Sequence, residues 1–352
     1  MTSSDSFAPF RFLRTGAIIQ SWRVGGLNIV LGFPTEDVYE THNEFYFGAT
    51  LGRVANRIKG AMLTNLNGAQ TYSLPENEGP NILHGGNKSW GKRKWDGPNR
   101  VEVRKIEGLF DVKGEQSLQF SLLSEDGDEG FPGSVDARVT YTAGWQTTER
   151  GEQVSVLQLE YEAELAGDAE ETVINMTNHS YFNLTGASTI TGTQVTLCSA
   201  QHLPKDAENI PVSGPEPFPA IKANEAFILS DTAPVVDHCF VINEAPETIP
   251  LDTRCLPLQN MAQTYHPESG IHVEVWGTDP AFQFYTGENT NVPAVAGMGA
   301  RGPRSAFCVE PSRYVNAPEV DEWRGMVLMK KGQRYGSRIV YRGWVDKDGR
   351  QT

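Results

Sequence analysis

The most regular pattern in this 352-residue chain is Val154-Ser155-Val156-Leu157-Gln158-Leu159-Glu160-Tyr161-Glu162-Ala163, in which apolar and polar residues largely alternate. Alternation with a period of two is typical of a β-strand, because successive side chains of a strand point to opposite faces of the sheet. The same period recurs in residues 135–141 and 271–276. These stretches predict a protein built mainly of β-strands.

Turn signals and shorter apolar runs extend this prediction over most of the chain. Residues 63–66 and 70–74 flank Asn67-Gly68, a pair that tolerates the positive φ angles of a tight hairpin turn. Only residues 318–325 have the features of a helix, with proline first, acidic residues in the first turn and glycine last. We therefore predict an all-β fold of antiparallel strands with very few short helices. Further strands are expected at residues 117–123, 190–198, 282–285, 306–309 and 335–341.

The chain shows no internal repeat and no flexible linker that would divide it. Residues 211–219 are rich in proline, but they lie between strand-like stretches and are expected to form a surface loop. The 35 glycines and 21 prolines favour many tight turns over a few long helices. We predict one sandwich-like β domain over residues 1–352.

The charge balance limits the possible partners. The chain has 30 Lys and Arg against 44 Asp and Glu, which gives a net charge of −14. Proteins that bind nucleic acids or anionic membranes need clustered cations, so both kinds of partner are disfavoured.

Location and redox state follow from simple features of the sequence. No stretch approaches the roughly 20 apolar residues of a membrane-spanning helix, and the polar start Met1-Thr2-Ser3-Ser4-Asp5-Ser6 does not resemble a secretory signal. Four isolated cysteines in a chain of this length indicate reduced thiols and not a disulfide framework. We therefore expect a cytoplasmic protein. The cysteines are Cys198, Cys239, Cys255 and Cys308.

Two loop-like segments carry polar side chains that suit ligand binding. In residues 51–58, Arg53, Asn56 and Arg57 lie among small and apolar residues, where they would hold sugar hydroxyls or a carboxylate, or else form a structural ion pair. His84 precedes Gly85-Gly86, and such a loop lets the backbone approach a ligand closely. A solvated loop histidine is the alternative for His84.

Two strand-like segments carry groups that suit acid–base chemistry. Residues 174–184 place His179 among three asparagines and several apolar residues, and histidine has the pKa best suited to proton transfer at neutral pH. Asp237 and His238 lie between two apolar runs, where the carboxylate would accept from hydroxyls or orient a base, or else lie in an ordinary turn.

Glu310 ends an apolar run, and partial burial there would raise its pKa toward that of a useful general base. The nearby Arg313 would lower that pKa, so the net direction stays open. The usual spacings of zinc and calcium ligands are absent. Residues 297–302 match a dinucleotide-binding fingerprint in letters but lack its strand and helix context, so no metal and no cofactor is expected.

Taken in order, these segments resemble the aldose 1-epimerase (galactose mutarotase) family. The matching motifs are YFGATLGRVANRI at residues 46–58, NILHGG at 81–86, NHSYFNLTG at 178–186, DHCF at 237–240, FQFYTG at 282–287 and CVE at 308–310. The resemblance implies a single β-supersandwich and a cofactor-free interconversion of the α and β anomers of a free hexose such as glucose or galactose.

The resemblance also implies roles for particular residues. Glu310 would act as general base on the anomeric hydroxyl, and His179 as general acid on the ring oxygen. The partner would be a small sugar, with the chain a monomer or weak dimer. The substrate-binding set expected from the same motifs is Arg57, His84, Asp237, Asn56, Tyr181 and Gln283.

The sequence departs from the usual family pattern near the expected site. Arg313 follows Glu310 where the family commonly has other residues, and Trp90 lies in a changed segment after Gly86. Both residues are therefore possible determinants of specificity. Arg313 would either form a local ion pair, which we favour, or contact a charged sugar such as a uronate or a hexose 6-phosphate.

Three further functions stay open at this point. The first is an epimerase of a charged sugar, and the second is a glycoside hydrolase that uses Glu310 and Asp237 as its two carboxylates. The third is a non-catalytic sugar-binding module.

Overall fold

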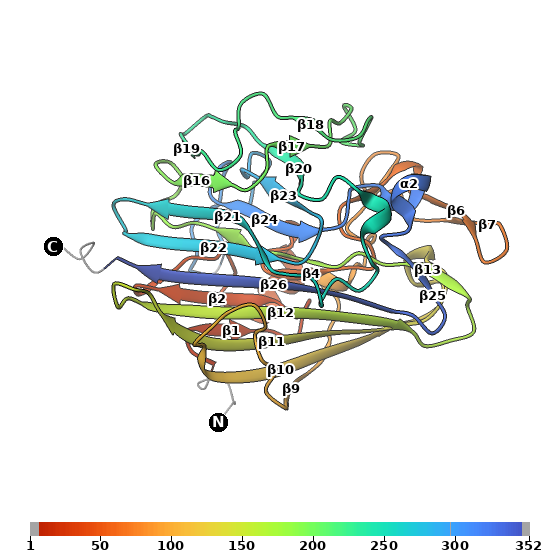
Figure 1. The fold of residues 1–352 in the computed structure, drawn as a ribbon, viewed down its shortest axis with the longest axis horizontal. Coiled ribbons are helices and arrows are strands. Elements are labelled where there is room, and N and C mark those ends of the chain that lie inside the picture. The colour runs from red at the N-terminus through yellow and green to blue at the C-terminus, as the bar shows by residue number, and fades with distance from the viewer. Residues whose placement is uncertain (1–6, 296, 347–352) are drawn as a thin grey trace.

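The computed structural model describes residues 7–295 and 297–346, and antiparallel strands make up most of its regular structure (Figure 1). The predicted all-β fold is confirmed. A short helix was correctly expected near residue 318, where a 3-10 turn at Ala317–Glu319 leads into α2 (Asp321–Arg324). The other helix, α1 (Glu36–His42), was not located from the sequence; it makes two turns and buries Val38 and Tyr39. The N-terminal residues 1–6 lie outside the described residues.

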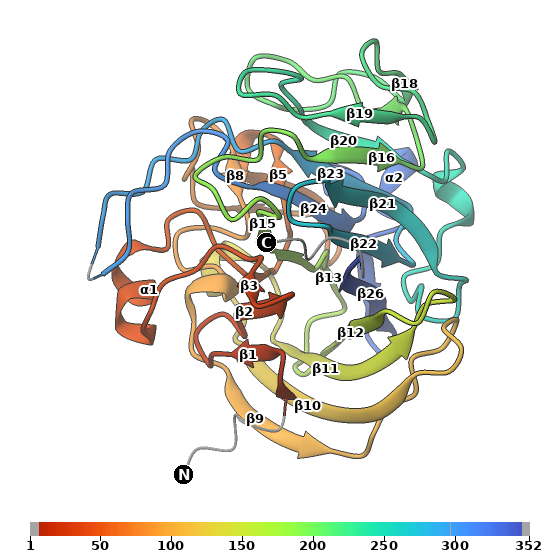
Figure 2. The ribbon, with the colours of Figure 1, turned by 90° about the vertical axis from the view of Figure 1, so that its left-hand side faces the viewer.

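A nine-stranded sheet forms one side of the molecule. The stretch 154–163 lies in β12, an interior strand of this sheet, and the alternation correctly predicted a strand there. Figure 2 shows that this sheet curves around strands of the other sheets. Its order is β19 (Ala226–Ile228), β16 (Gln194–Leu197), β21 (Gln259–His266), β22 (Ile271–Gly277), β26 (Arg334–Val345), β12 (Gln153–Leu165), β11 (Val135–Thr147), β10 (Lys113–Ser124) and β9 (Asp96–Val101).

A six-stranded sheet and several smaller ones complete the fold. The six-stranded sheet has the order β15 (Tyr181–Phe182), β24 (Phe307–Ser312), β23 (Ala281–Tyr285), β20 (Asp237–Val241), β17 (Gln201–His202) and β18 (Glu216–Pro217). A three-stranded sheet joins β1 (Phe10–Phe12), β2 (Ile19–Val24) and β3 (Leu27–Asn28). The pairs are β4 (Ala49–Leu51) with β14 (Thr177–His179), β5 (Arg57–Ile58) with β8 (Ile82–Leu83), β6 (Met62–Leu66) with β7 (Gln70–Ser73), and β13 (Glu171–Val173) with β25 (Leu328–Lys330).

The main core lies between the concave face of the large sheet and the smaller sheets. Trp22 of β2 stacks on Tyr341 of β26 and meets Phe182 of β15 edge to face, so one aromatic cluster joins three sheets. Leu159 and Tyr161 of β12 are fully buried in the same cluster. Close packing of this kind fixes the distance between the sheets.

The outer face of β12 is also covered, which the alternation alone did not predict. Glu160 and Glu162 are 9% and 8% exposed, because they pair with Arg104 and Arg254 from two loops that cross this face. Nearby, Val154 and Val156 pack against Ile106 of one of these loops. Buried charges are tolerated in proteins when they are paired.

Three smaller expectations can be compared with the structure. The hairpin at Asn67-Gly68 is confirmed, with positive φ angles at both residues between β6 and β7. All four cysteines are free thiols. Among the described residues, no helix is long and apolar enough to cross a membrane.

Candidate active site

All eight residues that were expected to be catalytic or substrate-binding line one cavity of about 210 Å³. Strands β20, β23 and β24 supply Asp237, Gln283 and Glu310, and β14 supplies His179. The other four come from β5, β15 and adjacent loops. They are Asn56, Arg57, His84 and Tyr181.

Glu310 and His179 face each other in this cavity. Nε2 of His179 lies 3.6 Å from Oε1 of Glu310, and the two residues are only 6% and 4% exposed. His179 is held in place by the ring of Tyr181, which stacks on the imidazole at 5.0 Å between centroids. We call these two residues the Glu310–His179 pair.

Burial controls the protonation of the Glu310–His179 pair. Burial, with the charge of Asp237 as a smaller cause, raises the pKa of Glu310 well above its usual value, which Arg57 offsets only in part. Burial lowers the pKa of His179 to about 4, although a backbone hydrogen bond and Asp237 act in the opposite direction. Both shifts favour the uncharged form, so the pair holds one proton at neutral pH and keeps it on the carboxyl group.

His84 is fixed as a hydrogen-bond donor toward the cavity. Its Nδ1 accepts the backbone N–H of Asn56 at 3.2 Å, and burial lowers its pKa well below the usual value. A neutral imidazole whose Nδ1 accepts carries its proton on Nε2. Close packing of the backbone, and not a ligand, requires glycine at position 85, since a Cβ there would lie 2.2 Å from the carbonyl oxygen of Gly52.

A chain of side-chain hydrogen bonds crosses the cavity. Asn56 donates to Oε1 of Gln283 at 3.3 Å, and Nε2 of Gln283 donates to Oδ1 of Asp237 at 2.6 Å. Lys205 donates to the other carboxylate oxygen at 3.2 Å. Burial alone would raise the pKa of Asp237, but Lys205, Arg57 and Gln283 lower it below the usual value. Asp237 is therefore a carboxylate that accepts hydrogen bonds.

Arg57 forms an ion pair with Glu78, a residue that the sequence did not single out. Both Nε and Nη2 of Arg57 donate to the carboxylate of Glu78, and Nη1 donates to Asn56 at 3.2 Å. Glu78 also lines the cavity, together with six further residues that were not predicted. These are Glu44, Phe45, Tyr46, Leu83, Tyr285 and Asn289. Of these, Tyr46, Leu83 and Tyr285 lay inside motifs already noted, whereas no signal marked Glu78 or Asn289.

Cys308 lies behind the pair. Its Sγ is 3.7 Å from Nδ1 of His179, and together with Glu310 these groups offer a thiol, an imidazole and a carboxyl within 4.8 Å of one another. Such a set is close enough to hold a metal ion. Burial raises the pKa of both Cys308 and Glu310 well above the usual values, so a metal would have to displace two protons.

Three residues singled out in the sequence lie outside the cavity lining. Arg313 is wholly buried, pairs with Asp279 and donates to backbone carbonyls, so it forms the local ion pair that was favoured over a contact with a charged sugar. Trp90 is 2% exposed and packs behind Gly52, outside the cavity. Arg53 is also buried and donates to the carbonyl oxygens of Pro132 and Gly133 at 2.9 and 2.7 Å. The partners of these three residues could not be predicted from sequence spacing, because they depend on which loops the fold brings together.

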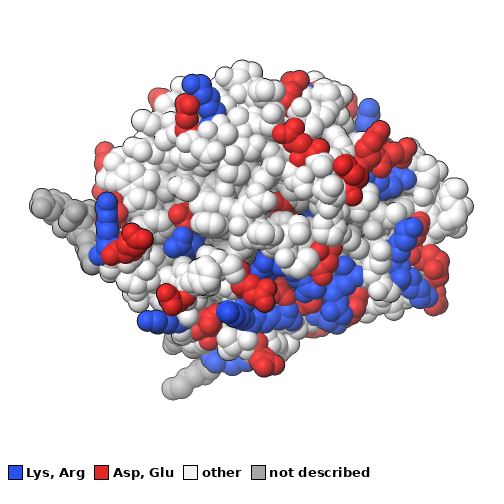
Figure 3. Space-filling view, in the orientation of Figure 1, with Lys and Arg blue, Asp and Glu red and all other residues white. Residues whose placement is uncertain are grey.

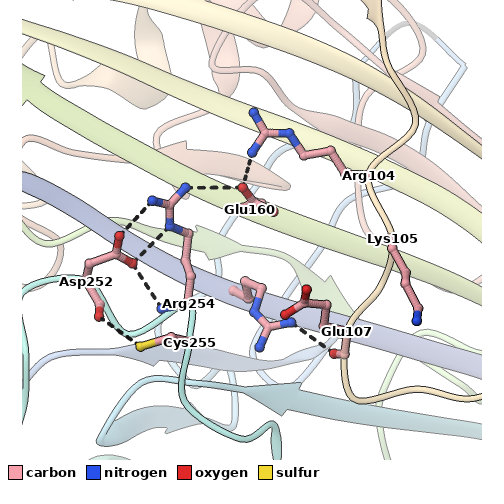
Figure 4. A pocket seen from close by; sticks show the side chains of 8 residues that line it. Arg104, Lys105, Glu107, Glu160, Asp252, Arg254 and Cys255 are labelled. Atoms are coloured by element: carbon pink, nitrogen blue, oxygen red, sulfur yellow. Dashed lines mark hydrogen bonds and ion pairs between the residues drawn. The ribbon is translucent and has the colours of Figure 1, made fainter.

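A second hollow, of about 490 Å³, lies on the outer face of the large sheet (Figure 4). Several of its charged side chains pair with one another: Arg254 lies between Asp252 and Glu160, and Arg104 also reaches Glu160. Figure 3 shows blue and red side chains intermixed over this part of the surface. The mixture indicates an ion-pair network that attaches loops to the sheet, not a charged binding site.

The fold and the cavity together define a β-sandwich protein with a buried carboxyl–imidazole pair. A family model described as aldose 1-epimerase matches residues 5–342, so the chain belongs to the aldose 1-epimerase family. The chain is 36% identical over 332 residues to the bifunctional protein GAL10 of Pachysolen tannophilus. That match covers 93% of this chain and 44% of GAL10, so the chain spans less than half of that relative.

Two further comparisons agree. The galactose mutarotase of Sus scrofa is 35% identical over 313 residues, which is 88% of this chain and 81% of that protein. The crystal structure of a GalM/aldose epimerase homologue from C. elegans superposes with a TM-score of 0.75 at 24% identity, covering 96% of both chains. This second likeness establishes the fold.

The buried ion pair of Arg313 gives a stability prediction. Replacing Asp279 with Ala leaves the guanidinium buried without its counter-charge, so we expect the free energy of unfolding to fall by about 3–5 kcal/mol. Urea denaturation followed by tryptophan fluorescence measures the change. Asp231→Ala, at an exposed loop position, is the control and should leave stability unchanged. A loss below about 1 kcal/mol for Asp279→Ala would contradict the structural role.

Proposed function

We propose that this protein interconverts the α and β anomers of a neutral free hexose, such as glucose or galactose. The observation that carries the proposal is the Glu310–His179 pair, a base and an acid 3.6 Å apart in a cavity of about 210 Å³. Opening a cyclic hemiacetal needs one proton to leave the C1 hydroxyl and another to reach the ring oxygen. The names of the galactose mutarotase relatives agree with this substrate class.

The proposed reaction balances without any further reactant. The proton that the resting pair holds on Glu310 first moves to Nε2 of His179. Glu310 then takes the proton of the C1 hydroxyl, the bond between C1 and the ring oxygen breaks, and its electron pair stays on the ring oxygen, which takes the proton of His179. The open aldehyde rotates about its C1–C2 bond. Both protons then return as the ring closes on the other face. His84 and Asp237 bind sugar hydroxyls, one as donor and the other as acceptor.

The charges around the cavity favour a neutral sugar. Four carboxyl groups line it, those of Glu44, Glu78, Asp237 and Glu310, against the single guanidinium of Arg57. That guanidinium is already paired with Glu78 at 2.7 Å. A phosphate or uronate would meet no free cation among the lining residues and several like charges nearby.

A glycoside hydrolase and a non-catalytic sugar-binding module fit the cavity less well. The hydrolase would need Asp237 as its second acting carboxylate, but both of its oxygens are bonded to Gln283 and Lys205. A sugar-binding module without turnover would bind galactose in calorimetry and leave its mutarotation rate unchanged. The cytoplasmic location, the single domain, the monomeric or weakly dimeric state and the absence of a cofactor stay predictions.

Removing either member of the pair should abolish most of the activity. Since each proton-transfer partner contributes roughly 10²–10⁴-fold, we expect Glu310→Gln and His179→Asn each to lower kcat by at least about 100-fold. Polarimetry of freshly dissolved α-galactose, with EDTA present throughout, measures the rate. Glu149→Gln and His42→Asn, both exposed, are matched controls. Activity near that of the wild type in either pair variant would refute the proposal.

The pKa shift of His179 predicts the acid side of the pH profile. The active pair holds one proton, and a second binds only when pH falls through the lowered pKa of His179, about 4. We expect kcat/KM to stay level down to about pH 6 and to fall near pH 4. An unperturbed histidine would place this limb near 6.5. A limb at that pH, in protein whose circular dichroism is unchanged, would contradict the assignment.

The charge argument gives a separate test of substrate preference. Wild-type protein should act faster on galactose than on galacturonate or glucose 6-phosphate. Glu78→Gln removes the carboxylate that pairs with Arg57, so we expect it to raise the ratio of the galacturonate rate to the galactose rate. Glu76→Gln changes a carboxylate two residues away, outside the cavity lining, and should not alter this ratio. A wild-type preference for either anionic sugar would contradict the neutral-substrate proposal.

A further inference from the structure

The proposed mechanism leaves one buried nucleophile beside the pair unused. Cys308 is fully buried on β24, two residues before Glu310, so both side chains project from the same face of the strand. The register of β15 with β24 places Tyr181 directly opposite Cys308. Sγ of Cys308 lies 3.7 Å from Nδ1 of His179, whereas Glu310 faces the other ring nitrogen, Nε2.

The proposed reaction restricts which nitrogen of His179 can carry the proton. Nε2 is the nitrogen that faces Glu310, and it must both give a proton to the ring oxygen and take it back. A neutral imidazole can accept at Nε2 only when its proton is on Nδ1. The tautomer with the proton on Nε2 has no lone pair there and cannot reclaim the proton when the ring closes.

We propose that Cys308 is a positioning residue whose sulfur accepts a hydrogen bond from Nδ1–H of His179 and so keeps Nε2 as the nitrogen that exchanges protons. The inference rests on the proposed function. It assigns Cys308 no contact with the sugar. The sulfur can accept from Nδ1–H in both the neutral imidazole and the imidazolium, so the same contact persists on both sides of the proton transfer.

The surroundings of the thiol suit this role. Burial raises the pKa of Cys308 well above its usual value, so the group stays an uncharged thiol beside the Glu310 carboxyl. A thiolate would instead stabilise the imidazolium and trap the proton on His179. Tyr181 stacks on His179 and limits rotation of the ring, so the tautomer and the ring orientation are fixed by two neighbouring strands of one sheet.

Nuclear magnetic resonance of protein labelled with ¹⁵N-histidine tests the tautomer directly. The chain has seven histidines, and the His179 signals are assigned by their loss in His179→Asn. In wild-type protein at neutral pH we expect the proton of His179 on Nδ1. A proton on Nε2 would overturn the proposal, whether or not the protein accelerates mutarotation. Absent mutarotation in the wild type would refute the proposed function separately.

Variants of Cys308 test the effect on catalysis. Cys308→Val replaces the acceptor with an apolar side chain one methyl group larger, so we expect kcat to fall roughly three- to tenfold with KM changed less than about twofold, and the proton to move partly to Nε2. Cys308→Ser keeps an acceptor, so its kcat should lie close to that of the wild type and the proton of His179 should stay mostly on Nδ1. Cys198→Val, at a position outside the cavity lining, is the control.

The opposite results are equally specific. A Cys308→Val protein that keeps both its kcat and the proton on Nδ1, or one in which KM alone rises, would overturn the proposal. Should this variant fail to fold, Cys308→Ala takes its place. The tautomer of His179 measured in wild-type protein tests the proposal without any variant of Cys308.

Discussion

The structure of the site depends on the burial of Glu310 and His179 beside each other. The two residues come from different sheets: β14 pairs with β4, whereas β24 lies inside the six-stranded sheet. Their separation of 3.6 Å is therefore set by the packing between sheets and not by either strand alone. The aromatic cluster around Trp22 joins the six-stranded sheet to the curved large sheet, and dense packing there leaves little freedom for the pair to separate.

The large sheet contributes rigidity without contributing any of the predicted site residues. Its concave face holds the aromatic core, and loops that ion pairs of Arg104 and Arg254 attach to β12 cover part of its outer face. The cavity is built from short strands and loops on the opposite side, which need such support because they make few ladder hydrogen bonds of their own.

The sequence predicted the strands more completely than the site. Alternation located β11, β12 and β22, because a period of two is a local property, and it missed that the polar face of β12 is buried, because the covering loops come from distant parts of the chain. Likewise the motifs identified Glu310 and His179, whereas Glu78 carried no local signal. For Arg313 the favoured ion pair is present, but its partner Asp279 is distant in the sequence and carried no local signal.

The same burial that shifts both pKa values also favours the chemistry proposed for the pair. Before ring opening, the proposed mechanism needs an ionised Glu310 and a protonated His179. After ring opening, Glu310 holds the proton of the C1 hydroxyl and His179 has given its proton to the ring oxygen, so both groups are uncharged. A low-dielectric surrounding favours this second arrangement. The pair is uncharged in the resting protein as well, so burial favours ring opening only from the ionised arrangement, which first forms by transfer of one proton from Glu310 to His179.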